Sequence, residues 1–262
     1  MDRPVLTVNA LTRRFARRGK PITAVDDVSF YIEPAETLAL AGPSGSGKST
    51  IARLLLRLIE PDAGTINFDG EDFLALKGAA LRRQRAKIQM VFQDPLAAFN
   101  PRATVAGVLG DPLRIHGIAS KADRPRHITR LLERVGLSTS LQHRAMHEIS
   151  GGQRQRVAIA RAIATKPLLV VLDEALSALD VSVRGKILEL LLDLQREEKL
   201  AYLFISHDLG VVRSIAHRIA ILDSGKIAEE GNARTVIDAP QSVVGKALVA
   251  AVPTLAADVS HR

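Results

Sequence analysis

Nine residues near the start of the chain carry a pattern suited to holding phosphate. They read GPSGSGKST, and Gly42, Gly47, Lys48 and Ser49 satisfy the spacing G-x-x-x-x-G-K-[ST]. Glycines let backbone N–H groups curl around phosphate oxygens, and the following helix points its positive end at them. The lysine offers charge to the β and γ phosphates, and the serine hydroxyl can hold Mg²⁺. The other loop residues taken as nucleotide contacts are Pro43, Ser44, Gly45, Ser46 and Thr50.

Two adjacent carboxylates end the most apolar strand-like segment. The run PLLVVLDE places Asp173 and Glu174 where open α/β sheets bind their ligands. In such a pair, the first carboxylate reaches Mg²⁺, usually through water, and the second can polarise the attacking water. Capping of the following turn is the alternative. We favour a metal partner at Asp173 and a general base at Glu174.

A second glycine pair opens another helix. Ser150, Gly151, Gly152 and Gln153 precede the amphipathic run RQRVAIARAI, so Ser150 is a natural N-cap and the glycines leave backbone donors exposed. Alone, these residues indicate a helix start. The first loop already supplies backbone donors to one side of a triphosphate. A second set of backbone donors would therefore bind the opposite face of the γ phosphate. Two copies arranged head to tail would satisfy that geometry.

The surrounding segments alternate between strand-like and helical patterns. Alternation of this kind favours a largely parallel sheet covered on both faces. A mainly helical stretch from about Pro95 to Ala164 predicts an inserted helical lobe. The predicted strands are 5–8, 24–32, 37–41, 64–68, 87–92, 168–172, 201–205, 219–222 and 226–230. The predicted helices are 51–59, 128–135, 153–163, 183–196 and 209–216, and those at 128–135 and 153–163 are the clearest of the lobe.

Composition narrows the class of protein. Of 262 residues, 47% are hydrophobic and 24% are charged, as in an ordinary globular protein. With no cysteine, disulfides, thiolate metal sites and a catalytic cysteine are excluded. No apolar run approaches the roughly 18 to 20 residues that cross a bilayer, and MDRPVLTVNALTRRF lacks a signal-peptide core, so we expect any membrane role to be peripheral.

The net charge of +8 leaves several anionic partners open. A basic cluster could suit nucleic acid, anionic lipid or nucleotide phosphates, although a solvated basic face is the commoner explanation. Aromatic residues make up only 3% of the chain, which supplies a base-stacking platform poorly. The cluster consists of Arg13, Arg14, Arg17, Arg18 and Lys20.

Taken in order, the motifs resemble those of the ATP-binding cassette (ABC) ATPases over nearly the whole chain. GPSGSGKST looks like the Walker A loop, ISGGQ like the family signature and VVLDE like Walker B. SALD, which ends at Asp180, resembles the D-loop, Gln93 the Q-loop glutamine and His207 in FISHD the switch histidine. Phe15 would be the aromatic that stacks on adenine, and Val25 is counted among the nucleotide contacts, as is Asp180.

The resemblance implies a fold and a mechanism. The implied fold is α/β: a P-loop NTPase (RecA-like) core with a mainly parallel sheet, an N-terminal antiparallel β subdomain and an inserted α-helical subdomain. Two such domains sandwich ATP between the Walker A loop of one and the signature of the other. ATP and Mg²⁺ are the implied cofactors. The implied catalytic residues are Glu174, His207 and Gln93; the metal contacts are Ser49, Gln93 and Asp173.

Other stretches resemble one importer subfamily. AVDDVSF, VFQDPLAAFNPR and the tail ALVAAVP are similar to importers of oligopeptides, dipeptides and nickel. This implies a second ATPase subunit, identical or homologous, two permeases and, indirectly, a periplasmic binding protein, with the chain at the cytoplasmic side of the inner membrane. Residues 94–102 would lie by the groove for a permease coupling helix. We expect a nucleotide-binding domain at 1–238, with helical subdomain 95–164, and a tail at 239–262.

The sequence departs from the family pattern at four points. Ala175-Leu176 replace the usual Pro-Thr, which bears on the rigidity of that turn, and Ala35 stands where glycine is expected. The tail has Val243-Val244-Gly245 in place of a Pro-Tyr-Thr-like stretch. The lack of cysteine removes the iron–sulfur cluster that some peptide-importer subunits carry.

Two other functions compete with transport. A soluble cassette ATPase acting on DNA or ribosomes would use the basic surface on phosphates, but such proteins add a coiled-coil insertion or a second cassette, and neither fits this length. We therefore expect no nucleic-acid partner. A regulatory cassette without turnover is disfavoured by the intact Glu174, His207 and Gln93. Cargo is selected by other subunits, so the sequence leaves it open.

Overall fold

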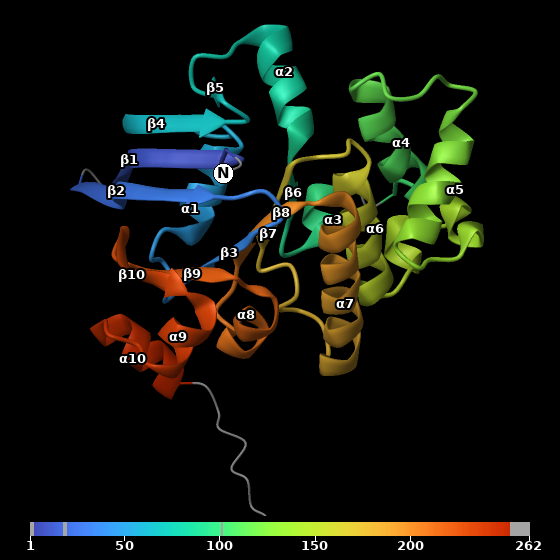
Figure 1. Cartoon of the computed structure of the whole chain (residues 1–262). Helices are drawn as coiled ribbons and strands as arrows, with labels where there is room; N and C mark the ends of the chain where they lie inside the picture. The colour runs from blue at the N-terminus through green and yellow to red at the C-terminus, as the bar shows by residue number, and fades with distance from the viewer. Residues whose placement is uncertain (1–2, 18–19, 101, 252–262) are drawn as a thin grey trace, which may run out of the picture.

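The computed structural model describes residues 3–17, 20–100 and 102–251. Arg18 of the basic cluster and residues 252–262 of the expected tail lie outside the described residues. Two sheets and a helical lobe make up the described chain (Figure 1). The strands are β1 (Leu6–Arg17), β2 (Lys20–Ile32), β3 (Thr37–Ala41), β4 (Ala63–Phe68), β5 (Glu71–Asp72), β6 (Ile88–Val91), β7 (Leu169–Asp173), β8 (Ala201–Ile205), β9 (Arg218–Asp223) and β10 (Lys226–Asn232).

Helices occupy most of the remaining described chain. The helices are α1 (Lys48–Leu55), α2 (Gly78–Lys87), α3 (Pro95–Ala98), α4 (Val105–Ile115), α5 (Arg124–Arg134), α6 (Gly151–Ile163), α7 (Val181–Glu198), α8 (Leu209–Ile215), α9 (Ala233–Asp238) and α10 (Val243–Ala250). Two 3₁₀ turns, η1 (Thr139–His143) and η2 (Met146–Glu148), lie between α5 and α6. Within the described ranges, no helix is both long and apolar enough to span a membrane.

The six-stranded sheet has the order β10-β9-β3-β8-β7-β6. All of its neighbouring pairs are parallel except β10 with β9. Every residue of β3 and of β8 is buried, because side chains on both faces are covered. The prediction of a largely parallel sheet is confirmed, and the carboxyl ends of β3 and β7 deliver the two motifs predicted to bind phosphate and metal.

An antiparallel sheet, β2-β1-β4-β5, forms the N-terminal part of the chain. Strand β1 is much longer than the predicted 5–8 because it continues through register shifts between Val8 and Arg14, where the alternation that marks a strand is broken. Ala35, between β2 and β3, has a φ of 58°. That left-handed conformation favours glycine, which accounts for the glycine that the family pattern has at this position.

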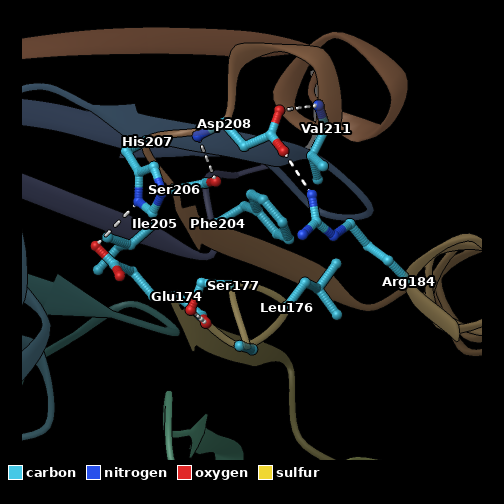
Figure 2. A pocket seen from close by; sticks show the side chains of 11 residues that line it. Glu174, Leu176, Ser177, Arg184, Phe204, Ile205, Ser206, His207, Asp208 and Val211 are labelled. Carbon is cyan, nitrogen blue, oxygen red and sulfur yellow. Dashed lines mark hydrogen bonds and ion pairs between the residues drawn. The ribbon is translucent and has the colours of Figure 1, made fainter. Parts of the chain in front are cut away.

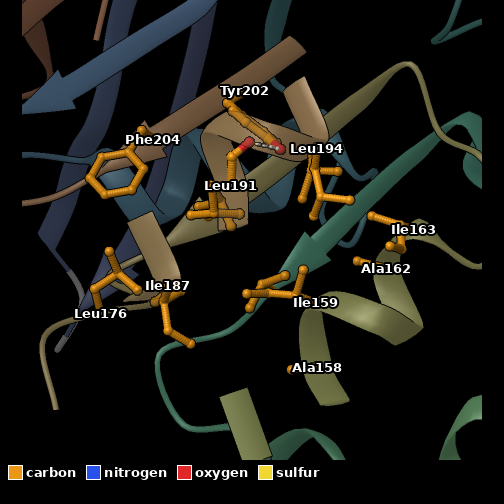
Figure 3. Packing of buried hydrophobic residues seen from close by; sticks show 14 of the residues in the cluster. Ala158, Ile159, Ala162, Ile163, Leu176, Ile187, Leu191, Leu194, Tyr202 and Phe204 are labelled. Carbon is orange, nitrogen blue, oxygen red and sulfur yellow. Dashed lines mark hydrogen bonds between the residues drawn. The ribbon is translucent and has the colours of Figure 1, made fainter. Parts of the chain in front are cut away.

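The segment between β6 and β7 is helical, as predicted. Figure 1 shows α4, α5 and α6 grouped on one side of the six-stranded sheet. Helix α6 packs with α7 against β8: Figure 3 shows Ile159 and Ile187 in one apolar layer, and the hydroxyl of Tyr202 donates to Leu191 O at 2.9 Å. This layer holds the start of α6 in a fixed place relative to the sheet.

Candidate phosphate-binding site

The loop between β3 and α1 is shaped by close backbone contacts. Gly47, with a φ of 111°, is the residue before α1, and no side chain caps the helix start. A Cβ on Gly47 would lie 2.3 Å from Ala24 O, and one on Gly42 would lie 2.3 Å from Leu222 O. Glycine is therefore required at both positions. The first N–H groups of α1 have no partner within the helix and are available to an acceptor such as phosphate.

Lys48 is buried beneath this loop. Its Nζ donates to Gly42 O and Pro43 O, both at 2.8 Å, and to Ser46 Oγ at 3.3 Å. Burial lowers the pKa of the Lys48 ammonium, while the carboxylate of Glu174 opposes the shift. Because burial disfavours the charged form of Lys48, an anionic ligand bound in the surrounding loop would stabilise the ammonium.

A cavity of about 180 Å³ opens beside the loop. Its lining residues are Ala24, Ser44, Gly45, Gly47, Lys48, Ser49, Thr50 and Glu174. The structure thus brings most of the predicted loop contacts together at one cavity. Val25 is an exception, because it is fully buried in the core and its neighbour Ala24 faces the cavity instead. Phe15 lies on β1, 38% exposed, with the Arg13 guanidinium 4.9 Å from its ring centroid.

Ser49 and Asp173 form the part of the site that suits a divalent cation. Ser49 Oγ donates to Asp173 Oδ1 at 3.2 Å. Burial raises the pKa of the Asp173 carboxyl, and the hydrogen bond from Ser49 opposes the shift. The described residues contain no group of three His, Cys, Asp or Glu that could hold a metal alone. Two oxygen donors beside a phosphate cavity nevertheless fit Mg²⁺, which prefers one or two carboxylates plus phosphate oxygens and water.

Glu174 is held by side chains from two other segments. Gln93 Nε2 donates to Glu174 Oε2 at 3.1 Å. His207 Nδ1 lies 3.5 Å from Glu174 Oε1, as Figure 2 shows. Gln93 also reaches Ser177 Oγ at 3.4 Å. These contacts unite the three residues predicted to be catalytic. They do not include the Ser49–Asp173 pair, so the metal-binding role of Gln93 stays a prediction.

The turn after Glu174 is closed without the Pro-Thr of the family pattern. Ser177 N donates to Glu174 O at 3.1 Å, and Ser177 Oγ donates to the same carbonyl at 2.9 Å. Ala175 and Leu176 are both buried. Glu174 itself has a φ of 47°, an uncommon conformation for a residue with a side chain. The turn is therefore fixed by Ser177 and by packing.

A second, smaller cavity of about 40 Å³ shares Glu174 with the phosphate cavity. His207, Ser177 and Ser206 also line it, and Figure 2 shows them around Glu174. That volume can hold a water molecule, and the lining offers polar partners for it. General-base hydrolysis requires the attacking water to lie between the carboxylate and the γ phosphorus, so the side of Glu174 that faces the phosphate cavity is the side that can serve catalysis. Sequence reasoning missed Arg184 and Asp208, which line this cavity and form an ion pair at 2.7 Å.

The second glycine turn lies apart from both cavities. Ser150 Oγ accepts from Gln153 N at 3.3 Å, and Gln153 Oε1 accepts from Ser150 N at 2.9 Å, so the two residues form a capping box. Gly151 is exposed, and a Cβ on it would have no neighbour nearer than 3.9 Å, whereas a Cβ on Gly152 would lie 2.7 Å from Val183 Cγ1. The residues from Ser150 to Gln153, all of which the structure describes, do not line the phosphate cavity of their own chain.

Asp180 lies beside this turn. Its carboxylate accepts from Val183 N at 2.9 Å and from Ser182 Oγ at 2.8 Å, so it caps α7. The hydrogen bond from the backbone of Val183 lowers the pKa of the Asp180 carboxyl. Like the glycine turn, Asp180 is exposed and does not line the phosphate cavity, so its contact with nucleotide stays a prediction.

Comparison with known sequences extends these local features to the whole chain. A family model described as "ABC transporter" matches residues 25–177. The glutathione import ATP-binding protein GsiA of Salmonella paratyphi A is 49% identical over 257 residues, covering 95% of this chain and 41% of that protein. GsiA of Escherichia coli K12 is 48% identical with the same coverage, 95% and 41%. The chain spans about two fifths of the length of these relatives.

Solved structures are similar over nearly the whole fold. The ATP-binding cassette MJ0796, a dimer in a post-hydrolysis state bound to ADP and Pi, matches with a TM-score of 0.78 and 28% identity, covering 87% of this chain and 99% of that one. CbiO1 from Clostridium perfringens, part of the ABC transporter complex cbiONQ, matches with a TM-score of 0.79 and 25% identity, covering 91% and 92%. The similarity therefore includes far more than the phosphate loop.

Proposed function

The chain belongs to the ABC transporter family, and on that premise we propose that it is the ATP-binding and ATP-hydrolysing subunit of an importer. One observation carries the proposal: Glu174 lines the phosphate cavity, and Gln93 and His207 contact its carboxylate. A carboxylate in that position can activate water next to a bound γ phosphate. A protein that merely bound nucleotide would have no use for the contacts that orient Glu174.

Nucleotide binding rests on the first glycine loop. The N–H groups at the start of α1 and the ammonium of Lys48 hold the phosphates. Ser49 and Asp173 would hold Mg²⁺, which would neutralise charge on the phosphate oxygens. Phe15 stacks on the adenine, and Ala24 lines the phosphate cavity.

Hydrolysis uses the Glu174 cluster. The oxygen of a water molecule attacks the γ phosphorus while its proton passes to the Glu174 carboxylate. The bond between phosphorus and the bridging oxygen breaks, and ADP leaves with that oxygen. Gln93 and His207 orient the carboxylate through the contacts at 3.1 and 3.5 Å. Fixing these groups before the reaction avoids the cost of ordering them during it.

The second glycine turn completes the site of another subunit. Because Ser150 to Gln153 lie outside the phosphate cavity of their own chain, they reach a nucleotide held by a second cassette, identical or homologous. The dimeric state of MJ0796 supports this arrangement. Closure on ATP and opening after hydrolysis then drive the transport cycle.

The importer role adds membrane partners and a cargo class. Two permeases receive the movement of the cassettes, with a periplasmic binding protein delivering cargo, and the chain works peripherally at the cytoplasmic side of the inner membrane. CbiO1 supports permease partners, since it is part of an ABC transporter complex. The relatives are named for glutathione import, which favours small peptides over nickel as cargo. Residues 1–238 are the nucleotide-binding domain, with 95–164 as its helical subdomain and 239–262 as its tail.

The test is the dependence of hydrolysis on chain concentration. If each nucleotide needs two cassettes, phosphate release per chain rises with concentration until dimers saturate, either for the chain alone or for the chain titrated with a homologous cassette subunit. Binding of ATP, measured by calorimetry, should saturate at one nucleotide per chain throughout. Hydrolysis per chain that is constant on dilution, with or without the second subunit, would refute the two-chain site, and failure to bind ATP would refute the function.

A further inference from the structure

A cavity of about 760 Å³ lies at the base of the helical lobe, beside the connection from α6 to β7. It shares no lining residue with the phosphate cavity. One side comes from α4 and α5, and the other from the end of α6, the connection to β7 and the end of α7. The lining residues are Leu113, Ile118, His127, Arg130, Leu131, Arg134, Ile163, Ala164, Lys166, Pro167, Leu168 and Glu198.

Most of the wall is apolar. Leu113 and Ile163 contribute from α4 and α6, and Leu131 from α5. Ile118, beside the cavity, is 38% exposed, so apolar surface continues to its mouth. A volume between about 300 and 1,000 Å³ with mainly apolar walls is typical of sites for small organic molecules. The wall is therefore suited to a hydrocarbon body.

Cations without partners stand at the same cavity. Among the described residues, no side chain pairs with or accepts a hydrogen bond from the side chains of Arg130 and Lys166, both of which are exposed. Arg134 is occupied, at 2.9 Å from Glu197 and 3.0 Å from Glu198. Glu198, the one carboxylate of the lining, is thereby committed to Arg134 and does not neutralise the other two cations.

The electrostatic potential around the cavity is also positive. Residues 95–164 contain 11 Lys or Arg and four Asp or Glu, so this segment carries +7 of the chain's net +8. The cavity opens beside that segment, and an anion approaching it is attracted by the whole helical lobe.

We propose that this cavity binds an anionic amphiphile, a molecule with one carboxylate or phosphate head group on an apolar chain. The head group pairs with Arg130 and Lys166, and the apolar chain covers Ile118, Leu131 and Leu168. A small inorganic anion would leave that wall in water, and a neutral apolar molecule would leave the cations unpaired. The occupant touches α5 and the connection from α6 to β7 at once, so it stabilises their contact.

Calorimetry on the full chain without nucleotide tests the proposal. The probes are octyl phosphate and octanoate, with octanol as the uncharged probe and inorganic phosphate as the head group without an apolar chain, all below micelle-forming concentrations. We expect octyl phosphate and octanoate to bind at one site, about tenfold or more tighter than octanol or phosphate, and to raise Tm with concentration. Arg130→Gln and Lys166→Gln should each weaken binding about fivefold.

Arg126→Gln is the matched control, because Arg126 is an exposed cation on the same helix and does not line the cavity. It should leave binding unchanged, and the Tm of each variant without probe verifies folding. The proposal is overturned if no probe binds, if octanol or phosphate binds as tightly as octyl phosphate, or if Arg126→Gln weakens binding as much as the two cavity variants. Because no nucleotide is present, failure here leaves the proposed ATPase function intact.

Discussion

The two glycine turns of this chain begin helices in similar ways but are completed differently. The loop before α1 is closed on itself: Lys48 donates to three acceptors, and backbone carbonyls leave no room for a Cβ at Gly42 or Gly47. The turn before α6 is capped by its own Ser150 and Gln153, yet the face at Gly151 is open to solvent. The loop before α1 is complete within one chain and can bind phosphate by itself. The exposed turn before α6 needs a second chain to complete a binding site.

The largest expected effect separates binding from turnover. Glu174→Gln keeps the shape of the side chain but cannot take a proton from water, so hydrolysis should fall by about a hundredfold to ten-thousandfold. ATP affinity should remain within about twofold, because neither glycine turn is changed. Phosphate release and calorimetry on the same preparation measure the two quantities. If affinity fell as far as hydrolysis, Glu174 would be a binding residue and not the base.

The next largest effect is expected from a change in the loop before α1, which should weaken ATP binding. Lys48→Met removes the buried ammonium and should weaken ATP binding by about a hundredfold, since a hydrogen bond to a charged group is worth about 1.5 to 3 kcal/mol. Calorimetry on the chain alone suffices, because this loop needs no partner. Lys166→Met, a cation far from the loop, is the control. Unchanged affinity for ATP in the Lys48 variant would mean that this loop does not hold phosphate.

A smaller effect, on the rate of hydrolysis, is expected from a change in the exposed turn before α6. Gly151→Ala adds a methyl group where the described chain has nothing within 3.9 Å, so folding and ATP binding by one chain should be unchanged. Hydrolysis should fall by about tenfold because the methyl group keeps the second chain from approaching. Gly185→Ala, another open helical glycine, is the control and should hydrolyse normally.

Mixing the two defective chains sharpens this result. Lys48→Met and Gly151→Ala chains, each poor alone, should regain part of the hydrolysis when combined, because one composite site then has an intact glycine turn from each chain. Phosphate release measured across mixing ratios would reveal that recovery. Hydrolysis that is simply the mean of the two variants would argue against sharing of sites between chains.

The smallest effect concerns stability and pH. The pKa of Asp173 is raised by burial, so its contribution to stability is present below the unfolded value of about 3.9 and is lost as pH rises through the folded value. Asp173→Asn should therefore raise Tm at pH 7 by about 2 °C, and the advantage should shrink on acidification. Thermal melts between pH 4 and 7 measure this difference.

Asp180 provides the opposite case. Its pKa is lowered by hydrogen bonds at the start of α7, so its contribution is present at neutral pH and is lost as pH falls through the folded value. Asp180→Asn should lower Tm slightly at pH 7 and have no effect in acid. If both variants moved Tm in the same direction, burial would not be what distinguishes the two carboxylates.

Local patterns in the sequence predict most of the site. The first glycine loop, the Asp173–Glu174 pair and the capping box depend on near neighbours in the chain, so their spacing is informative. Val25 does not reach the cavity because alternate residues of a strand face opposite sides, and in β2 the inward side belongs to Val25. Helix α2 escapes prediction because GAALRRQRAK has too few apolar residues for a periodic pattern.

Other features could not be predicted because they join distant segments. The contact of Gln93 with Glu174 spans 81 residues of sequence, and the ion pair of Arg184 with Asp208 joins α7 to the start of α8. The cavity beside Arg130 and Lys166 exists only where two helices of the lobe meet the connection from α6 to β7 and the end of α7. Such contacts depend on topology, which periodicity does not specify.

Because Glu174 belongs to the walls of two cavities, a ligand in either cavity lies against the same side chain. Thermodynamic reciprocity then sets a condition on any coupling through that side chain: the factor by which bound phosphate changes the affinity of the small cavity for water is the factor by which that water changes the affinity for phosphate.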